Sequence, residues 1–538
     1  MAFLAGILAT WGLPPGPNPL WTILGAAIWL RLLERTPHAQ HDGGQSPTQA
    51  ISPTKAFQVR RGARLGFMFG LGHFLFGLDW LWTSLHIYGK IPAPAAMLVI
   101  LLLAAILAIY PAIFGALQIF LVARPLFLLG VAPALWVLTE WLRAHLFSGF
   151  FWNPLGQTWD GAPVYLQLAD LGGVYLLSAL TLFLAAVLAW FSRPANWRRR
   201  RQVGLVLLLT LVVCGAGYGY GSWRMKGLDA SLKAGAASGE GATGEMLRVA
   251  LVQGNIAQDL KWVPERQKEW LERYLDQTLA LEQEVDLVVW PETAAAFFLQ
   301  GAPRELERIV DVSRAVRAPI LTGAPMAERA ANREWRFFNS MVIIGAEETG
   351  AFEYRYDKHH LVPFGEYIPL RFLVPDSVHK LTHGSKDFTP GPGPALLGWE
   401  MGDIGPLICY EVIFPDEVRQ LARQGARWLI NLTNDGWFGE SAKPQHLSMA
   451  RMRAVENRLP MIRVANSGIS AVIDPLGREL GRIPSNEQGS LVITLAAGPG
   501  GSIWSGYGHL WMPFWAGVSF VFWVAGRRLN ARTAQNSV

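Results

Sequence analysis

Three polar side chains, each placed just after an apolar stretch of the chain, are of the types that covalent acyl transfer requires. Glu292 follows the apolar run 286–290, and Cys409 follows the run 405–408. Lys358 ends an alternation of aromatic residues, which places it on a buried face if this segment is a strand. Ligands of α/β sheets bind beyond the carboxyl ends of the strands, so the three side chains could converge.

The chemistry of such a group depends on the thiol. A thiol with the ordinary pKa of ~8.5 is only a few per cent thiolate at neutral pH. A carboxylate such as Glu292 can take its proton. A nearby ammonium such as Lys358 favours the thiolate and can stabilise the oxyanion of a tetrahedral intermediate. The set therefore suits acyl transfer through a thioester.

Each of these residues also has an ordinary structural explanation. Cys409 could be a small core residue, because unpaired cysteine is among the most buried residue types. Glu292 could be the first-turn carboxylate of a helix that begins after Pro291, and Lys358 could be a solvated surface lysine. The joint pattern favours a site more strongly than any single residue does.

The composition places much of the chain in a membrane. The 538 residues are 51% hydrophobic and only 16% charged, against roughly 25% charged in soluble proteins. The 23 tryptophans fit aromatic belts at a bilayer surface. The net charge of +6 comes with no basic face interleaved with aromatic residues, so we predict no nucleic-acid partner. The two cysteines form neither a disulfide framework nor a zinc site, and Cys214 is interpreted as an inert packing residue.

We predict about eight membrane spans, at 1–13, 18–33, 62–86, 93–122, 126–147, 163–191, 203–221 and 508–526. Clusters of Lys and Arg fall between alternate spans, which predicts that both termini are cytoplasmic and that the segment after span seven lies outside the inner membrane. The predicted division is 1–227 for spans one to seven, 228–245 for a flexible linker, 246–498 for an α/β domain, and 499–538 for the last span and a cytoplasmic tail. The loop at 36–57 is assigned no role.

The segment 246–498 alternates between strand and helix patterns. We expect strands at 247–252, 286–290, 320–322, 341–344, 405–408 and 428–432, and helices at 264–284 and 303–316. This alternation indicates an α/β layered domain with helices on its faces.

The motifs resemble those of the nitrilase (carbon–nitrogen hydrolase) superfamily. The three signature blocks are Trp290-Pro291-Glu292-Thr293, the segment 357–366 (Asp-Lys-His-His-Leu-Val-Pro-Phe-Gly-Glu) and Cys409-Tyr410-Glu411. Further similar segments are 251–256, 431–438 and 466–468. Together with eight spans and the segments 140–143 and 149–152, the chain resembles the apolipoprotein N-acyltransferase family of the bacterial lipoprotein pathway. The resemblance implies an αββα sandwich inserted into a polytopic helical membrane domain.

The resemblance also implies roles for individual residues. Glu292 becomes the general base, Lys358 the electrostatic stabiliser and Cys409 the nucleophile, with no metal or organic cofactor. The supporting residues that it implies are Glu366, Tyr410 and Glu411, and it implies Trp262 as a substrate-binding residue near the active site. We further hypothesise that Trp437, Phe438 and loops near 361–390 dip toward the membrane and admit acyl chains, although Trp437 could equally be a core residue.

The implied reaction moves an acyl chain from a membrane phospholipid, with phosphatidylethanolamine as the expected donor, to the α-amine of a diacylglyceryl-cysteine on an apolipoprotein. It runs in two half-reactions through a Cys409 thioester, in the inner membrane of a bacterium with the α/β domain in the periplasm.

Two alternatives remain open on the residues alone. A membrane-anchored amidase of the same superfamily could hydrolyse a small amide, but eight spans are excessive for an anchor. A transporter or binding protein with an external sensor domain is disfavoured, because the spans show no obvious repeat and few paired charges.

Overall fold

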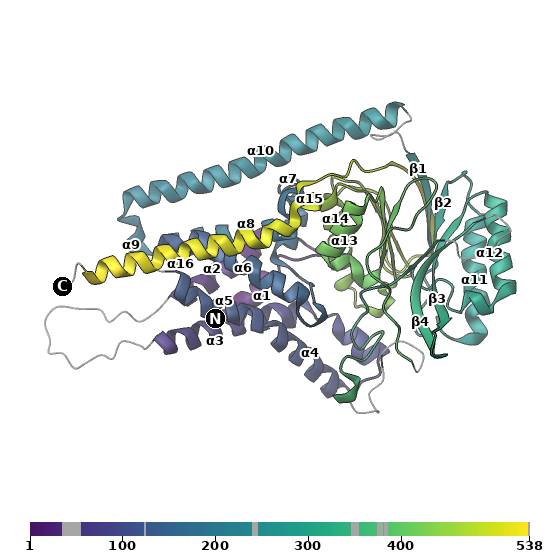
Figure 1. Ribbon diagram of the computed structural model, residues 1–538, viewed down its shortest axis with the longest axis horizontal. Helices are drawn as coiled ribbons and strands as arrows, with labels where there is room; N and C mark the ends of the chain where they lie inside the picture. Colours follow the sequence, from purple (N-terminus) through teal and green to yellow (C-terminus); the bar gives the residue numbers. More distant parts are fainter. Residues whose placement is uncertain are drawn as a thin grey trace.

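The computed structural model describes residues 1–34, 55–122, 125–238, 246–345, 354–373, 380 and 386–535. It has a helical part, made of residues 1–238 and 503–535, and an α/β part, made of residues 246–496 (Figure 1). The two parts lie end to end, and the long helix α10 (Arg200–Ser238) runs along the helical part toward the α/β part. The predicted loop at 36–57 falls mostly outside the described residues.

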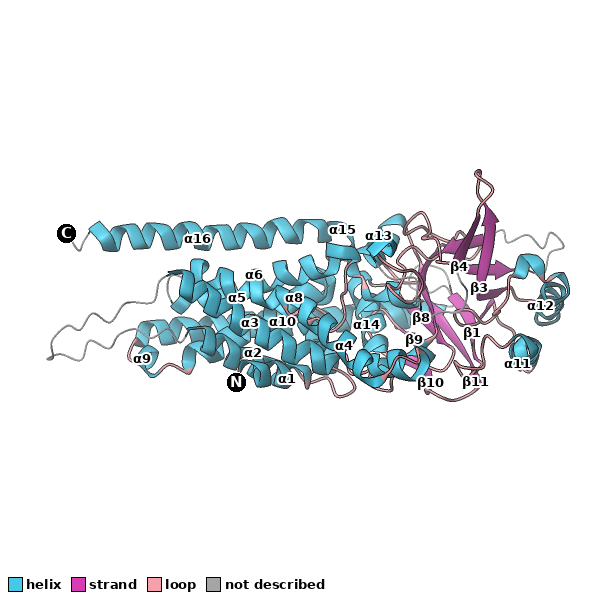
Figure 2. Ribbon diagram, turned by 90° about the horizontal axis from the view of Figure 1, so that it is seen from below, coloured by secondary structure: helices cyan, strands magenta, loops and turns pink. Residues whose placement is uncertain are grey.

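The helical part is built mainly from apolar helices that pack against one another. The longer ones besides α10 are α1 (Ala2–Thr10), α2 (Pro19–Glu34), α3 (Lys55–Gly77), α4 (Ala93–Leu107), α5 (Ile109–Leu121), α6 (Leu128–His145), α8 (Ala169–Phe191) and α16 (Trp511–Gln535). Short helices α7 (Pro163–Leu166), α9 (Pro194–Trp197) and α15 (Ile503–Tyr507) connect them. Figure 2 shows that most of the long helices run roughly parallel to the long axis of the molecule.

Four helical stretches of the described residues are long and apolar enough to cross a membrane. They are Ala93–Ile119, Pro125–Ser148, Ala169–Phe191 and Arg200–Lys233. The predicted total of eight is therefore not confirmed. Among the others, α1 has nine residues and α2 sixteen, fewer than the ~20 that a straight span needs. Helix α3 carries several basic residues in its first half.

The structure differs from the prediction of a flexible linker at 228–245. Helix α10 continues through Ser238, so the linker prediction is wrong for 228–238, while 239–245 lie outside the described residues. Leucine, lysine and alanine in this stretch are good helix formers. The helix also has a tertiary partner, because Asp229 forms an ion pair with Arg478 of the α/β part (2.5 Å).

The α/β part contains two sheets. The first has six strands in the order β11-β1-β2-β3-β4-β5, and the second has five in the order β10-β9-β8-β7-β6. The strands are β1 (Met246–Gln253), β2 (Leu287–Val289), β3 (Ile320–Arg329), β4 (Trp335–Ile344), β5 (Tyr354–Asp357), β6 (Ile404–Ile408), β7 (Trp428–Thr433), β8 (Met461–Ala465), β9 (Ser470–Ile473), β10 (Glu479–Ile483) and β11 (Gly489–Ala496). Strands β1, β2 and β3 are parallel to one another, and so are β6, β7 and β8.

The sheets face each other across a buried apolar core, and helices cover their outer faces. Residues such as Leu251 on β1 and Ile430 on β7 belong to the core between the sheets. Helices α11 (Gln267–Leu279) and α12 (Pro303–Val316) cover the first sheet. The result is a helix–sheet–sheet–helix sandwich, as the resemblance implied.

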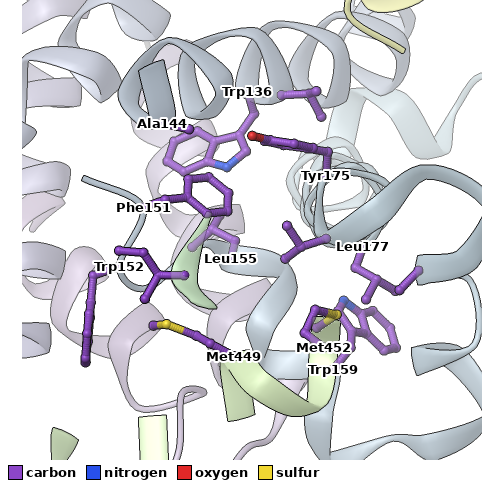
Figure 3. Packing of buried hydrophobic residues seen from close by; sticks show 14 of the residues in the cluster. Trp136, Ala144, Phe151, Trp152, Leu155, Trp159, Tyr175, Leu177, Met449 and Met452 are labelled. Atoms are coloured by element: carbon purple, nitrogen blue, oxygen red, sulfur yellow. The ribbon is translucent and has the colours of Figure 1, made fainter. Parts of the chain in front are cut away.

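The second outer layer joins the α/β part to the helical part. It is made of α13 (Pro415–Gln424) and α14 (Ala442–Asn457). Side chains of α14, including Met449 and Met452, share one buried cluster with Phe151, Trp152 and other residues of the helical part (Figure 3). A continuous apolar core therefore holds the two parts together. It fixes the position of the second sheet relative to the helical part.

All six predicted strands are present, as is the helix predicted at 303–316. The helix predicted at 264–284 is shorter, because α11 ends at Leu279. The chain must then turn into β2, and the Asp286 carboxylate accepts a hydrogen bond from the Arg248 backbone amide at the entrance to that strand (2.6 Å).

Candidate active site

One cavity of about 760 Å³ lies between the two parts. From the helical part its wall includes Trp80, Leu81, Leu85, Val99, Leu103, Ile106, Leu107, Arg143, Leu146, Phe147, Phe150 and Trp152. From the α/β part it includes Trp262, Glu292, Asn339, Lys358, Glu366, Cys409, Tyr410, Asn434, Trp437 and Phe438. The wall is thus mostly apolar along the helices, apart from Arg143, and polar where the strands of the two sheets end.

Cys409 follows β6 directly, at the start of a short 3-10 turn. Its φ of 53° lies in the left-handed region, which a residue with a side chain seldom adopts unless its surroundings hold it there. The Cys409 carbonyl accepts a hydrogen bond from His446 Nε2 of α14 (3.2 Å). The side chain is only 6% exposed, and the sharp turn presents it to the cavity.

Glu292 lies just after β2, where the chain packs tightly against the neighbouring strand β3. A Cβ on Gly323 would lie 2.8 Å from Glu292 Cα, so this close approach requires glycine. Glu292 is 7% exposed, and its Oε1 accepts a hydrogen bond from Asn339 Nδ2 of β4 (2.8 Å). The same Asn339 amide donates to Glu366 Oε1 (2.8 Å), so one side chain orients both carboxylates.

Lys358 follows β5 and is 1% exposed. Its Nζ lies 2.9 Å from Glu366 Oε2 and 3.7 Å from Glu292 Oε1. Glu366 is itself held by the Val362 backbone amide, which donates to Oε2 (2.8 Å). The ammonium is therefore fixed between two carboxylates at the wall of the cavity.

The electrostatics of the site keep the thiol protonated at rest. Burial and the nearby Glu292 carboxylate raise the pKa of Cys409 to about 12, although Lys358 opposes this. For Lys358, burial favours the neutral amine, but Glu366 and Glu292 outweigh it and raise its pKa above the ordinary value. The resting site thus pairs a neutral thiol with a charged lysine that lies beside the Glu292 carboxylate.

Sequence reasoning missed a second buried lysine. Lys261 is 1% exposed, and its Nζ donates to the Glu292 backbone carbonyl (2.9 Å). Burial lowers the pKa of Lys261 to about 8, against the opposing effects of Glu292 and Cys409. The sequence feature that could have pointed to Lys261 is its position next to the predicted site residue Trp262. Asn339 was also missed, since a single Asn within a strand carries no local pattern.

Four of the residues predicted around the site, Tyr410, Trp262, Trp437 and Phe438, line the cavity. The Tyr410 hydroxyl reaches the Gly149 carbonyl of the helical part (3.5 Å). Trp437 contacts Tyr88, with ring centroids 5.9 Å apart.

Phe438 packs against Trp80 and Trp152, with ring centroids 4.8 and 5.7 Å apart. Trp437 and Phe438 are both half-buried between the two parts. Of the loops near 361–390, residues 374–379 and 381–385 lie outside the described residues.

Glu411 does not line the cavity. It connects the signature segment that holds Cys409 with the one that holds Lys358. Its Oε2 accepts from the Ile408 amide (2.7 Å), while its Oε1 accepts from the Tyr356 hydroxyl and the His359 amide (2.7 Å each). Burial raises its pKa to about 7, and Glu417 adds to this. Glu411 thereby ties the turn that carries Cys409 to the segment that carries Lys358.

We expect Glu411→Ala to lower both the thermal stability and the activity of the protein. The substitution leaves several buried hydrogen-bond donors without an acceptor, which lowers the free energy of unfolding by about 3 kcal/mol or more. The midpoint of thermal unfolding of the detergent-solubilised protein measures this. Glu400→Ala serves as the control, because Glu400 is exposed. Equal midpoints for the two variants would contradict the bracing role.

The geometry can perform nucleophilic acyl chemistry. A thiol, a carboxylate and an ammonium line one cavity, and a second carboxylate holds the ammonium in place. Two residues of the apolar wall, Val99 and Ile106, are also partly exposed on the outside of the helices. Among the described residues, no group of three or more His, Cys, Asp or Glu side chains could hold a metal ion.

The comparisons with known proteins agree with this architecture. Residues 248–498 match the family model described as carbon-nitrogen hydrolase, and residues 5–187 match that of the apolipoprotein N-acyltransferase N-terminal domain. The chain is 36% identical over 526 residues to the apolipoprotein N-acyltransferase of Geobacter metallireducens, covering 96% of this chain and 93% of the relative. It is 37% identical over 431 residues to that of Pseudomonas aeruginosa, covering 79% and 80%.

Among solved structures, Saccharomyces cerevisiae Nit3, a member of the nitrilase superfamily, aligns with 20% identity and a TM-score of 0.36 over 49% of this chain and 93% of its own. The identity to the curated relatives extends through both the helical and the α/β parts. The chain therefore belongs to the apolipoprotein N-acyltransferase family.

Proposed function

We propose that this protein transfers an acyl chain from a membrane phospholipid, through a thioester on Cys409, to the N-terminal amine of a diacylglyceryl-cysteine on apolipoproteins. The observation that carries the proposal is the cavity, which joins the thiol, Glu292 and Lys358 to an apolar wall made by the helices. A small polar amide has no use for such a wall, whereas an acyl chain does. The names of the relatives support lipoprotein N-acylation as the overall reaction.

In the first half-reaction, Glu292 takes the proton of the Cys409 thiol, and the sulfur attacks the ester carbonyl carbon of the phospholipid. Lys358 stabilises the negative charge that develops on the carbonyl oxygen. The bond between the carbonyl carbon and the glycerol oxygen then breaks. The leaving oxygen takes the proton from Glu292, which releases the lysophospholipid and leaves the acyl thioester.

In the second half-reaction, the α-amine of the acceptor attacks the thioester carbonyl. Glu292 accepts a proton from the attacking amine, the carbon–sulfur bond breaks, and the proton returns to the sulfur. The products are an N-acylated lipoprotein and the free thiol. Because donor and acceptor use the same thiol in turn, the kinetics are ping-pong.

The membrane arrangement is part of the proposal. We infer about eight spans, with residues 1–227 and 499–538 in the inner membrane and 246–498 forming the catalytic domain in the periplasm. The four apolar helices and the alternating basic clusters support this. Both termini are then cytoplasmic, and phosphatidylethanolamine is the proposed donor.

Intact mass spectrometry tests the first half-reaction. The purified protein is incubated with phosphatidylethanolamine, and its mass is measured before and after hydroxylamine treatment. We expect a mass increase of one acyl chain that hydroxylamine removes. A folded protein that gains no adduct would refute the thioester step and leave the small-amide hydrolase as the better explanation.

We expect Trp437→Ala and Phe438→Ala each to weaken the use of the phospholipid donor by about tenfold, mainly through a higher KM, because each removes apolar contact area from the cavity. The rate of acyl transfer is measured against donor concentration in mixed micelles. Trp335→Ala is the matched control, because Trp335 is 53% exposed on β4. Donor dependence that matches the control would exclude both side chains from the acyl-chain path.

A further inference from the structure

A buried polar cluster contacts the backbone of Cys409, and the proposed reaction gives it no role. Its members, each with 0% exposure, are Asn431 in β7, Asp435 just after β7, His446 in α14 and Arg463 in β8. Arg463 Nη2 lies 2.6 Å from Asp435 Oδ2, so the two buried charges are paired. Arg463 Nη1 donates to Asn431 Oδ1. One guanidinium thus binds both a carboxylate and an amide.

The neighbours of the His446 ring place different demands on its two nitrogen atoms. Nε2 lies 3.2 Å from the Cys409 carbonyl oxygen, which can only accept a hydrogen bond. Nδ1 lies 3.0 Å from Arg463 Nη2, which can only donate, and 3.0 Å from Asp435 Oδ1. Burial and the Arg463 charge lower the pKa of His446, although Asp435 opposes them. The imidazole is therefore neutral at neutral pH and has a single N–H.

That single proton belongs on Nε2. In this tautomer Nε2 donates to the Cys409 carbonyl and Nδ1 accepts from Arg463, so both contacts are hydrogen bonds. With the proton on Nδ1, the Nε2 lone pair would face the carbonyl oxygen. Asp435 does not need the imidazole proton, because Thr433 Oγ1 donates to its Oδ1 (2.9 Å) and Arg463 donates to its Oδ2. Arg463 therefore selects the tautomer that binds Cys409.

Asn431 approaches the same carbonyl from β7. Because its Oδ1 accepts from Arg463, its amide nitrogen points the other way, toward β6. Asn431 Nδ2 donates to the Leu407 carbonyl (3.2 Å) and reaches the Cys409 carbonyl at 3.5 Å. His446 makes the shorter of the two contacts with Cys409, so it is the main link between the cluster and this residue.

The Cys409 carbonyl is important because the backbone of this residue is strained. Its φ of 53° is costly for a residue with a side chain and persists only where the surroundings hold it. In this conformation the side chain of Cys409 borders the cavity. A donor fixed on the carbonyl restrains the peptide plane after Cys409, and so it opposes relaxation of the turn.

We propose that His446 is a positioning residue, whose Nε2–H holds the Cys409 carbonyl and thereby the backbone turn that presents the sulfur to the cavity. The proposal rests on the proposed role of Cys409 as nucleophile. His446 itself does not line the cavity, so it acts on the attack by the sulfur and not on binding of the donor. No covalent bond forms or breaks at His446.

The test follows formation of the acyl-enzyme against time. The full-length protein in detergent is mixed with phosphatidylethanolamine at several concentrations, without acceptor, and the acylated fraction is measured by intact mass. The rate constant reports the attack by the sulfur, whereas the plateau reports the fraction of molecules that are folded and able to react. A variant that is merely less stable lowers the plateau and leaves the rate constant unchanged.

His446→Phe keeps a ring beside Trp152 and Phe438 but has no N–H for the Cys409 carbonyl. We expect its rate constant at saturating donor to fall about tenfold, with the donor concentration for the half-maximal rate unchanged. His446→Gln can place an amide N–H close to the position of Nε2, and it should react within about threefold of the parent. If His446→Phe does not fold, His446→Met, which also lacks a donor, replaces it.

Met452→Ala is the matched control. Met452 is 1% exposed in the same helix and belongs to the apolar core shown in Figure 3. Its truncation destabilises α14 without removing the hydrogen bond to Cys409. The control should therefore lower the plateau at most and keep the rate constant of the parent.

Equal rate constants for His446→Phe and His446→Gln, whether both match the parent or both are slow, would overturn the proposal. So would a loss in Met452→Ala as large as that in His446→Phe. In each of these cases the parent still forms the acyl-enzyme. A parent that forms none would instead refute the thioester step, and the role of His446 with it, so the two failures are distinguishable.

Discussion

Cys409→Ala is expected to abolish acyl transfer, with a loss of about 10⁴-fold or more, because both half-reactions pass through this sulfur. Alanine retains the Cβ of the strained turn, and the side chain that is removed already borders the cavity. The variant should therefore fold. It should also show no mass increase after incubation with phosphatidylethanolamine, because no thioester can form.

The measurement compares N-acylation of a diacylated acceptor peptide with the mass of the enzyme after exposure to the donor alone. Cys214→Ala is the matched control, since Cys214 lies in α10, away from the cavity lining. It should retain both activities. If Cys409→Ala kept more than about one hundredth of the parent rate, covalent catalysis at this residue would be untenable.

Glu292→Gln is expected to reduce acyl transfer by about 10³-fold while making the Cys409 thiol more reactive toward iodoacetamide at neutral pH. Transfer falls because glutamine cannot accept the thiol or amine proton. The thiol becomes more acidic because the Glu292 charge, after burial, is the largest cause that raises the pKa of Cys409. Lys358 remains nearby to favour the thiolate, and the glutamine oxygen can still accept from Asn339.

The faster alkylation expected for Glu292→Gln follows from the fraction of thiolate. Below the pKa of the thiol, the thiolate fraction rises as that pKa falls, so alkylation accelerates while acyl transfer slows. Both rates are measured on the same preparation in the Cys214→Ala background. Glu282→Gln, at an exposed position, is the control and should change neither rate. A fall in both rates together would indicate a disrupted site rather than the loss of a general base.

Local patterns in the sequence were enough to predict most elements of the α/β part. The apolar runs that became β1, β2, β3, β4, β6 and β7 were each recognised, because a buried strand is a short apolar stretch bounded by polar or turn residues. Helix α12 was predicted with its bounds, since Pro303 marks its first turn. The end of α10 was missed because the composition of 228–238 suits both a linker and a helix, and the contact between Asp229 and Arg478 is invisible in the sequence.

The sequence by itself determined the residue types of the candidate site. Glu292, Lys358 and Cys409 stand at the ends of apolar runs, and their blocks were sufficient to indicate the family. Only the tertiary structure decided which other side chains these three residues contact. The ion pair between Lys358 and Glu366, the contact of Lys261 with Glu292, and the hydrogen bond from His446 to the Cys409 carbonyl join segments from different strands and helices.

The physical reason is that local propensity acts over a few residues, whereas these contacts depend on how two sheets and a helical bundle pack. Trp152 shows this clearly. In the sequence it follows a span, in one of the segments that resemble the family, and neither fact names its neighbours. In the structure it packs on Phe438 and His446 and donates from Nε1 to Gln445 (2.7 Å). The cavity between the helical and α/β parts exists because of such packing, and no local pattern in the chain encodes it.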